Sequence, residues 1–486
     1  MLKRTIAAFL FALLVSGICT GCKTADGGVG NMTIPSSETD EDGNDSVAVV
    51  DYDGYRYRMY GQGLSIGATI VVEETSSDPL DSAMYRRNEK VKSLYNISID
   101  AQEKGNAYKL ASENAGEDLV DVFYVPERMH YQNCAEYAVN LLDIPTLHLD
   151  REYWNQEHNR VMTVDGILQT AAGNIYASEE LCLTVLVLNN KLFEQNGNDV
   201  KAFQQDVIDG KWYYEDFYSY VKQGTKDTDG IPGMTSSDIY GLLTGWDIYW
   251  QLYNSAGLSV IEKGEDGKYE FTVSTDKTLS AFNIFEDITS SASICQFGEE
   301  WGGTRNFDGM YTSFTKDHGL FATMRVYDLD SLKSMKSDYT ILPIPKIYES
   351  LERYYTVADG YNSVLWIPKT VESVSRTGLI TEALAYYSDE YQSVLYNKVL
   401  TDRYANDSVS QRLLKMIFSD IRWQLDEELN IMDFRQSICH VWAKNRQGVD
   451  GFAATTKNSI TRANDNLNTI TDLIKKSRNN INDSNR

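Results

Sequence analysis

The chain has 486 residues and carries 45 lysines and arginines against 70 aspartates and glutamates, a formal net charge of −25. Such acidity argues against nucleic-acid binding, because the phosphate backbone would be repelled instead of releasing its counterions to lysines and arginines. The length exceeds what one hydrophobic core usually covers, and the 32 tyrosines favour clefts or interfaces, where a ring can bury area and keep a hydrogen bond.

The N-terminus has the pattern of a signal peptide. Two basic residues precede the apolar run TIAAFLFALLVSGI, which is too short to span a bilayer as a helix. The run ends in Thr20-Gly21-Cys22, which resembles the lipobox of bacterial lipoproteins. That resemblance implies a signal peptide over 1–21 and acylation of Cys22, which would anchor the chain to the outer face of the cytoplasmic membrane. An ordinary secretory signal peptide is the alternative. The Gly-, Ser- and Asp-rich residues 22–60 predict an acidic flexible tether.

After the tether, strand patterns alternate with helix patterns. The apolar run ATIVV (68–72) predicts a buried strand, and Asp78 followed by Pro79 predicts the start of a helix. ISID and residues 118–125 predict two more strands, and YQNCAEYAVNLLDI (131–144) a second helix. Strands that alternate with helices form βαβ units, so we expect a mainly parallel sheet covered by helices on both faces.

A second α/β unit begins at LTVLVLNNKLFEQNG (183–197), where a strand is followed by a helix. We expect a helix in DGKWYYEDFYSYVKQG, a strand and a helix in IYGLLTGWDIYWQLYNSAG, a hairpin at EDGKYEFTV and a strand in GLFATM (319–324). YTILPIPK contains two prolines, which fit an extended crossing rather than a central strand. NSVLWIPKT (362–370) predicts a last buried strand before the C-terminal helices.

Several of these stretches, in this order, resemble bacterial extracellular solute-binding proteins of the maltose-binding type, which are lipoprotein receptors of sugar ABC transporters. The stretches are YRRNEKVKSLYNISI, GNIYASEELCLTVLVLNNKLFEQNG, DGKWYYEDFYSYV, FTKDHGLFATM and ILPIPK. The resemblance as a whole covers about residue 65 to 460, nearly the whole folded part. The first crossing departs from the family pattern, because Tyr176 is followed by Ala177-Ser178-Glu179 where the family usually has Gly-Leu-Pro.

The resemblance implies an α/β, two-lobe periplasmic-binding-protein-like fold, with a mainly parallel sheet flanked by helices in each lobe and a ligand cleft between the lobes. Residues 62–175 with 346–400 would form the N-terminal lobe, and residues 180–341 with 405–480 the C-terminal lobe. The implied function is that of a lipid-anchored extracellular receptor, not an enzyme, that closes its lobes on a carbohydrate such as an oligosaccharide. It would deliver this ligand to the membrane permease of an ABC transporter, as a monomer without a cofactor and without a nucleic-acid partner.

The ends of the expected strands supply candidate ligand-binding residues. Open sheets leave crevices at the carboxyl ends of their strands and at domain interfaces. A sugar offers hydroxyl groups and flat faces of C–H groups, so its site calls for aromatic rings beside carboxylates and arginines that form charge-assisted hydrogen bonds. On these grounds we select Glu73, Glu74, Tyr124, Glu127, Arg128, Trp246, Asp247, Trp250, Trp301, Arg325, Tyr327, Asp359, Tyr361 and Asn362.

Several of these choices and one further motif keep a structural alternative. Glu73 and Glu74 fit solvated loop acids as well as ligand-binding groups. Trp246 and Trp250, one helical turn apart, fit an apolar helix face as well as a sugar platform. Asp227, Asp229 and Asp238 suggest a calcium loop, but the regular third acid and the distal glutamate of an EF-hand are missing. That departure favours a plain turn without a metal.

Signatures of enzymes are weak in this chain. GLSIG (63–67) matches Gly-x-Ser-x-Gly, but a nucleophile elbow has a strand before its serine, and here the tether precedes it. The four cysteines after Cys22 lie far apart without zinc-binding spacing, so we expect mostly free, buried thiols. A glycoside hydrolase needs only two carboxylates and therefore stays open as an alternative, as does a protein-binding surface lipoprotein.

Overall fold

The computed structural model describes residues 47–61, 72–102, 117–129, 136–273, 276–358, 360–400, 407–446 and 449–484. All of them belong to one compact unit, residues 37–486. Among these residues, no helix combines the length and the apolar composition that a membrane span requires. The expected signal peptide and Cys22 lie outside the described residues.

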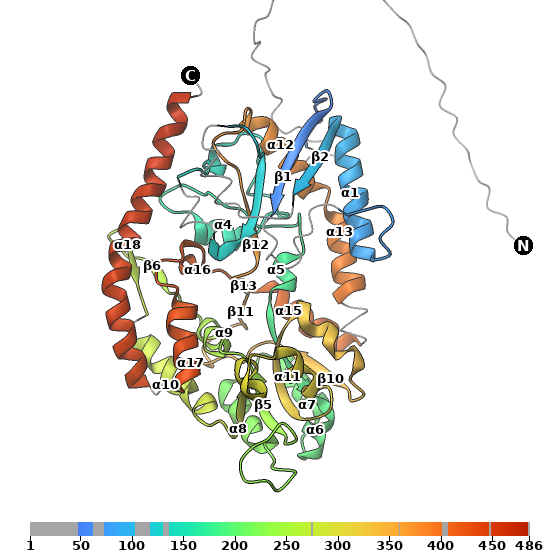
Figure 1. Cartoon of the computed structure of the whole chain (residues 1–486), viewed down its shortest axis with the longest axis vertical. Helices are drawn as coiled ribbons and strands as arrows, with labels where there is room; N and C mark the ends of the chain where they lie inside the picture. The colour runs from blue at the N-terminus through green and yellow to red at the C-terminus, as the bar shows by residue number, and fades with distance from the viewer. Residues whose placement is uncertain are drawn as a thin grey trace, which may run out of the picture. The chain divides into compact units, whose positions relative to one another are not determined.

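The first sheet has four strands in the order β12-β3-β1-β2. β1 pairs in parallel with β2 and β3, whereas β12 runs antiparallel to β3 at one edge. Helices α1, α12 and α13 cover this sheet, and α1 and α13 run side by side (Figure 1). The elements are β1 (Tyr55–Gly61), α1 (Pro79–Tyr95), β2 (Ile97–Gln102), β3 (Val122–Pro126), β12 (Ser363–Trp366), α12 (Val374–Tyr386) and α13 (Asp389–Val394).

Helix α1 begins where the sequence predicts it. The Asp78 side chain accepts hydrogen bonds from the backbone N–H groups of Leu80 at 2.7 Å and Asp81 at 3.4 Å, which caps the helix, and Pro79 occupies its first position. These bonds satisfy N–H groups that have no partner inside the helix. Asn96 ends the helix in the left-handed conformation with φ 47°, and β2 follows at once.

The expected tether extends too far toward the first lobe. Residues 55–61 fall within or beside the predicted tether 22–60, yet they form β1, which lies between β2 and β3. Tyr57 and Met59 are buried, and Arg58 on the other face pairs with the buried Asp121 at 3.0 Å. The strand therefore has the alternating pattern of a sheet with one covered face. Residues 68–71 of the strand expected at ATIVV lie outside the described residues.

The second sheet has five strands in the order β10-β4-β9-β5-β8. β5 is parallel to β8 and β9, whereas β4 is antiparallel to β9 and β10, so this sheet is mixed rather than mainly parallel. β4 adjoins the segment by which the chain enters the sheet, and it alone runs against the other four strands. β10 adjoins the segment by which the chain leaves; it is antiparallel to β4 and so runs in the same direction as β9. The strands are β4 (Thr184–Asn189), β5 (Tyr240–Thr244), β8 (Cys295–Phe297), β9 (Gly319–Arg325) and β10 (Tyr339–Leu342).

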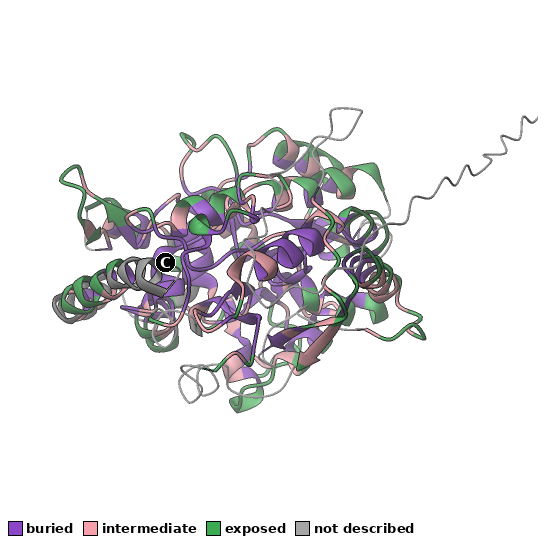
Figure 2. Cartoon of the chain, turned by 90° about the horizontal axis from the view of Figure 1, so that it is seen from above, coloured by how far each residue is buried: buried purple, intermediate pink, exposed green. Residues whose placement is uncertain are grey.

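Helices α6 to α11 and α15 accompany the second sheet, and the hairpin β6–β7 forms at the expected EDGKYEFTV stretch. Figure 2 shows that the strands and the inner helices hold most of the buried residues, while exposed residues follow the outer helices. These elements are α6 (Asn190–Gln195), α7 (Val200–Ile208), α8 (Tyr214–Gly224), α9 (Ile248–Ser255), β6 (Ile261–Lys263), β7 (Tyr269–Phe271), α10 (Asp276–Ser290), α11 (Phe307–Phe314) and α15 (Ser408–Ser419).

Three segments connect the two sheets. The short helix α5 (Ser178–Leu181) occupies the first crossing, where the family pattern has Gly-Leu-Pro, and Leu183 bridges to Ala358 of the second crossing. Strand β11 (Thr356–Val357) in the second crossing pairs in parallel with β13 (Ile421–Arg422) in the third. The main strands of the predicted N-terminal lobe, β2, β3 and β12, lie in the first sheet, and those of the predicted C-terminal lobe, β4, β5, β8, β9 and β10, lie in the second. The exact lobe limits stay a prediction.

The helix expected over 131–144 is wrong for its described part. Ala138 forms a bridge to Pro368, and only Leu141–Asp143 make a 3-10 turn, so these apolar residues extend the edge of the first sheet. The remaining helices of the described residues are η1 (Glu127–Met129), α4 (Gln156–Met162), η3 (Gly298–Gly303), η4 (Val326–Ser334), η5 (Leu395–Leu400), α16 (Leu425–Leu429), η6 (Phe434–His440), α17 (Val441–Asn445) and α18 (Val449–Ser484).

Candidate functional site

The first group of candidate residues lies where β3 and β12 meet the loops at their ends. β3 ends at Pro126, which pairs with Ser363 at the start of the antiparallel β12. The residues just beyond this pair are neighbours, and the backbone N–H of Glu127 donates to the carbonyl oxygen of Asn362 at 2.7 Å. The sheet therefore places two of the selected residues side by side.

Glu127 and Asn362 hold buried polar atoms that no other side chain among the described residues satisfies. Glu127 is 3% exposed and Asn362 is fully buried. Glu127 Oε1 and both amide atoms of Asn362 find no hydrogen-bond partner in the described part of the chain. Burial raises the pKa of Glu127 well above its usual value, and Glu428 and Glu427 add to the effect while Arg435 opposes it. Because such atoms cost free energy when unsatisfied, they are suited to meet the hydroxyl groups of a ligand.

Arg128 and Tyr361 form the rim next to this pair. The Arg128 guanidinium donates to the Tyr361 hydroxyl at 2.7 Å, and its carbon Cζ lies 4.1 Å from the centre of the Tyr361 ring. Both side chains are half-buried. A ring held flat by a guanidinium is the kind of surface on which the C–H face of a sugar can stack.

The second group lies beyond β5, at the start of α9. Arg435 of η6 donates to both carboxylate oxygens of Asp247, at 2.6 and 2.9 Å, and the same carboxylate lies 2.6 Å from His440 Nε2. Burial alone would raise the pKa of Asp247, but the charges and hydrogen bonds of Arg435 and His440 hold it well below its usual value. This carboxylate is therefore ionised throughout the neutral range.

A single arginine joins the two groups. Besides Asp247, Arg435 contacts Glu427 of α16, with Nη1 and Oε1 at 3.3 Å. Glu427 lies against Gly360 so closely that a Cβ on this glycine would collide with its carboxylate. Gly360 precedes Tyr361, so the charged chain from Asp247 reaches the loop that carries the first group.

Trp246 borders the Asp247 cluster. Its backbone N–H donates to both carboxylate oxygens of Glu299, at 3.1 and 3.2 Å, and its ring lies 6.2 Å from the His440 ring in a T-shaped arrangement. The indole is half-buried, which leaves part of its surface open for stacking. Trp250, by contrast, is 1% exposed and packs beside Tyr253 and Phe434. This agrees with the alternative that Trp250 belongs to an apolar helix face.

The other selected residues are dispersed around these two groups. Arg325 pairs with Asp328 at 2.7 Å. Tyr327 is 56% exposed, and Trp301 is 8% exposed beside the Tyr240 ring. Glu73 and Glu74 are exposed, Tyr124 is buried in a T-shaped contact with Tyr176, and Asp359 lies outside the described residues.

The loop between α8 and β5 brings Asp227, Asp229 and Asp238 together. Their carboxylates offer oxygen atoms within 4.8 Å of one another. The Asp238 carboxylate accepts hydrogen bonds from the backbone N–H groups of Thr228 and Thr235, both at 2.7 Å, and such bonds lower its pKa to about 2. The same bonds are those of a tight turn, which is the interpretation that the sequence favours over a calcium loop.

Sequence reasoning missed the residues that the third crossing brings to the site. Glu427, Glu428, Arg435 and His440 come from α16 and η6, which are short elements near the end of the chain. The run LDEEL places three acids in one turn, which reads as a solvated helix, yet all of its residues are buried. Their position at the candidate site becomes apparent only from their contacts with residues of distant segments.

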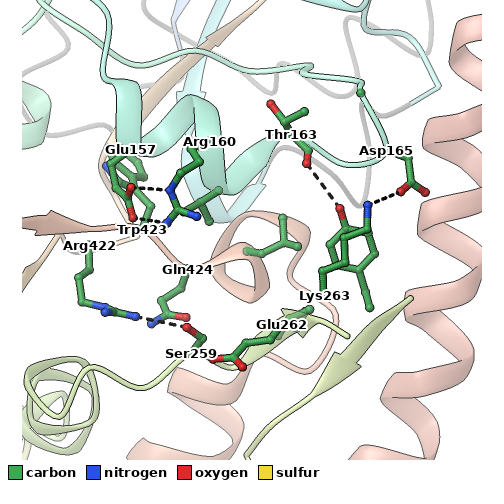
Figure 3. A pocket seen from close by; sticks show the side chains of 15 residues that line it. Glu157, Arg160, Thr163, Asp165, Ser259, Glu262, Lys263, Arg422, Trp423 and Gln424 are labelled. Atoms are coloured by element: carbon green, nitrogen blue, oxygen red, sulfur yellow. Dashed lines mark hydrogen bonds and ion pairs between the residues drawn. The ribbon is translucent and has the colours of Figure 1, made fainter. Parts of the chain in front are cut away.

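A separate pocket of about 640 Å³ is lined by none of the selected residues (Figure 3). Its walls come from α4 and the turn that follows it, from the hairpin β6–β7 and from β13 with the start of α16. In the predicted division of the chain, α4 belongs to the N-terminal lobe, and the other two walls belong to the C-terminal lobe. Sequence patterns gave no signal for this pocket, because its residues are spread over three segments.

Comparisons with known proteins identify a fold. No protein-family model matches the chain, and no curated protein matches it. Among solved structures, an ABC substrate-binding protein from Listeria monocytogenes in complex with cycloalternan superposes with a TM-score of 0.55. The match covers 86% of this chain and 100% of that one, at 12% sequence identity. The chain has the fold of a substrate-binding protein. The predicted fold class is therefore confirmed, with the strand directions corrected as described above.

Proposed function

We propose that the chain is an extracellular receptor that binds a carbohydrate between its two lobes and delivers it to an ABC permease. The observation that carries this proposal is the continuous set of polar groups from Glu127 and Asn362, through Glu427 and Arg435, to Asp247. Glu127 follows β3 of the first sheet and Asp247 follows β5 of the second, so one ligand that contacts the whole set would favour a closed arrangement. The structural neighbour was solved with the carbohydrate cycloalternan, which supports this ligand class.

The arrangement favours binding over hydrolysis. A glycoside hydrolase uses one carboxyl group as an acid and a second carboxylate as a base or nucleophile. Both oxygens of Asp247 accept bonds from Arg435, and one also faces His440, so this carboxylate is held in place rather than free to react. We include in the proposal that the receptor is monomeric and is attached to the membrane by acylated Cys22.

Asn362→Leu tests the proposal, because the Asn362 amide makes no hydrogen bond in the described part of the chain. The substitution should leave the unfolding free energy unchanged or slightly raised, since no bond within the protein is lost. A panel of glucose oligosaccharides and cycloalternan, screened by thermal shift, would first find a ligand. Calorimetry should then show binding at least about tenfold weaker in the variant, equal to 1.4 kcal/mol.

Asn254→Leu is the matched control. Asn254 is also fully buried, but its amide donates to the Trp250 carbonyl at 2.9 Å and accepts from Gln424 at 2.7 Å. This control should lose stability and keep ligand affinity. If Asn362→Leu binds the ligand as tightly as the unmodified chain, the site is misplaced. Release of shorter sugars during the same incubations would instead establish the hydrolase.

A further inference from the structure

The pocket in Figure 3 differs from the strand-end site in its charge pattern. Two ion pairs stand at its walls: Arg160 with Glu157, at 2.6 Å, and Lys263 with Asp165, at 3.1 Å. Each pair is neutral by itself. The exposed Glu262 lines the same pocket and forms no ion pair in the described part of the chain.

Arg422 is the cation of this pocket that has no carboxylate partner among the described residues. Its Nη2 donates to two neutral oxygens, the Leu258 carbonyl at 3.1 Å and the Ser259 hydroxyl at 3.3 Å, and its Cζ lies 4.9 Å from the Tyr355 ring. Its Nε–H is buried and has no hydrogen-bond partner there. Burial lowers the pKa of Arg422, since water is largely removed from the guanidinium. A desolvated guanidinium with free donors binds carboxylates well.

The next residue adds a second unused donor. Trp423 is 4% exposed, and its Nε1–H finds no partner in the described residues. Its ring is fixed by an edge contact with His158, at 4.6 Å between ring centres. Thr163 and Tyr269 also line the pocket, are half-buried and supply hydroxyl groups. Besides the two ion pairs and the exposed Glu262, the lining therefore combines one positive group, unpaired among the described residues, with neutral donors and acceptors.

We propose that this pocket is a second binding site, which takes a small molecule that carries one carboxylate beside several hydroxyl groups, such as a sugar acid. The carboxylate meets Arg422, and the hydroxyl groups meet the neutral polar side chains. A volume of about 640 Å³ is within the range of small-ligand pockets. A neutral sugar would leave the guanidinium without a counter-charge, and a more highly charged anion would be repelled by Glu262.

The test uses glucuronate and, as its neutral counterpart, methyl glucoside. Calorimetry on the full chain should show glucuronate binding at least tenfold more tightly than methyl glucoside. Arg422→Gln should weaken glucuronate binding at least tenfold and leave the affinity for the oligosaccharide of the strand-end site unchanged. Arg353→Gln is the control: Arg353 pairs with Asp420 at 2.6 Å, is exposed and does not line the pocket, so glucuronate binding should persist.

A second variant keeps the proposal testable if Arg422→Gln fails to fold. Ser259→Leu places a larger apolar group in the pocket, next to Arg422, and should also weaken glucuronate binding at least tenfold. Equal binding of glucuronate and methyl glucoside, or no binding of glucuronate, would overturn the proposal. So would glucuronate binding that persists in a folded Arg422→Gln or Ser259→Leu variant. None of these results depends on whether the strand-end site binds an oligosaccharide.

Discussion

Asp247→Asn should reveal how much the buried charge cluster contributes to stability. The substitution keeps the size of the side chain but removes the negative charge that faces Arg435. The Arg435 side chain is 5% exposed, and after the change the Glu427 carboxylate still lies 3.3 Å from it. Breaking a fully buried pair costs about 3–5 kcal/mol, because the remaining charge stays in a poorly solvated place. Since Asp247 is 32% exposed, water compensates part of this, and we expect a loss of about 2–3 kcal/mol.

Asp100→Asn provides a matched comparison. Asp100 pairs with Arg56 and is itself 31% exposed, nearly the same as Asp247, but its arginine is 65% exposed. Solvent screens that pair, so its loss should cost less than about 1 kcal/mol. Urea unfolding followed by tryptophan fluorescence measures both variants. Equal losses in the two variants would refute the claim that burial of Arg435 makes the Asp247 pair strong.

The sign of the pH dependence is also fixed for this cluster. The folded-state pKa of Asp247 is depressed, so its contribution to stability is present above the pKa of the unfolded chain, near 3.8, and is lost as the pH falls further. The difference between Asp247→Asn and the unmodified chain should therefore stay constant from about pH 6 to pH 8 as far as Asp247 itself is concerned, and shrink in acid.

Three further variants probe other parts of the fold. Burial raises the pKa of Glu179 in the first crossing to about 8, so the unmodified chain should lose up to about 1.4 kcal/mol per pH unit between pH 4.5 and 8. Glu179→Gln should flatten this slope in pH-dependent urea titrations; an unchanged slope would show that the group is not responsible. Gly360→Ala should lower the free energy of unfolding by about 1–3 kcal/mol, because the new Cβ meets the Glu427 carboxylate. An unfolding curve that coincides with that of the unmodified chain would show that the loop shifts without cost. Asp78→Ala should cost about 1 kcal/mol by uncapping α1, and amide exchange in the first turn should increase; unaltered exchange would contradict the cap.

Local sequence signals predicted the elements whose boundaries are set by local chemistry. Asp78 and Pro79 determine the start of α1, and the residues of EDGKYEFTV form the expected hairpin with Gly267 in its turn at φ 80°. The strand and helix at 183–197 appear as β4 and α6. In each case the contacts that determine the element are made between residues a few positions apart, so a short stretch of sequence is enough to predict it.

The predictions of secondary structure were wrong where contacts between distant segments determine the structure. β1 has an alternating pattern, but its position next to an acidic segment hides it until it is paired with β2 and β3. The residues around Ala138 are apolar at helical spacing, yet their bridge to Pro368 in a segment far along the chain prevents a helix. Helix propensity is a weak preference, and tertiary pairing overrides it.

The same distinction between local and distant contacts explains which residues of the candidate site could be predicted from the sequence. Glu127 and Arg128 directly follow β3, and Tyr361 and Asn362 directly precede β12, which is antiparallel to β3. A search at strand ends therefore finds them together with Asp247. The partner that links these residues, Arg435, follows no strand. It comes from a short helix of the third crossing, and its role depends on Asp247 lying 188 positions earlier in the chain. A hinged receptor needs such contacts between distant segments, since its ligand must be coupled to both lobes at once. Residues that provide the coupling are therefore the ones that local patterns describe least, and substitutions at Arg435 should affect stability and ligand binding together.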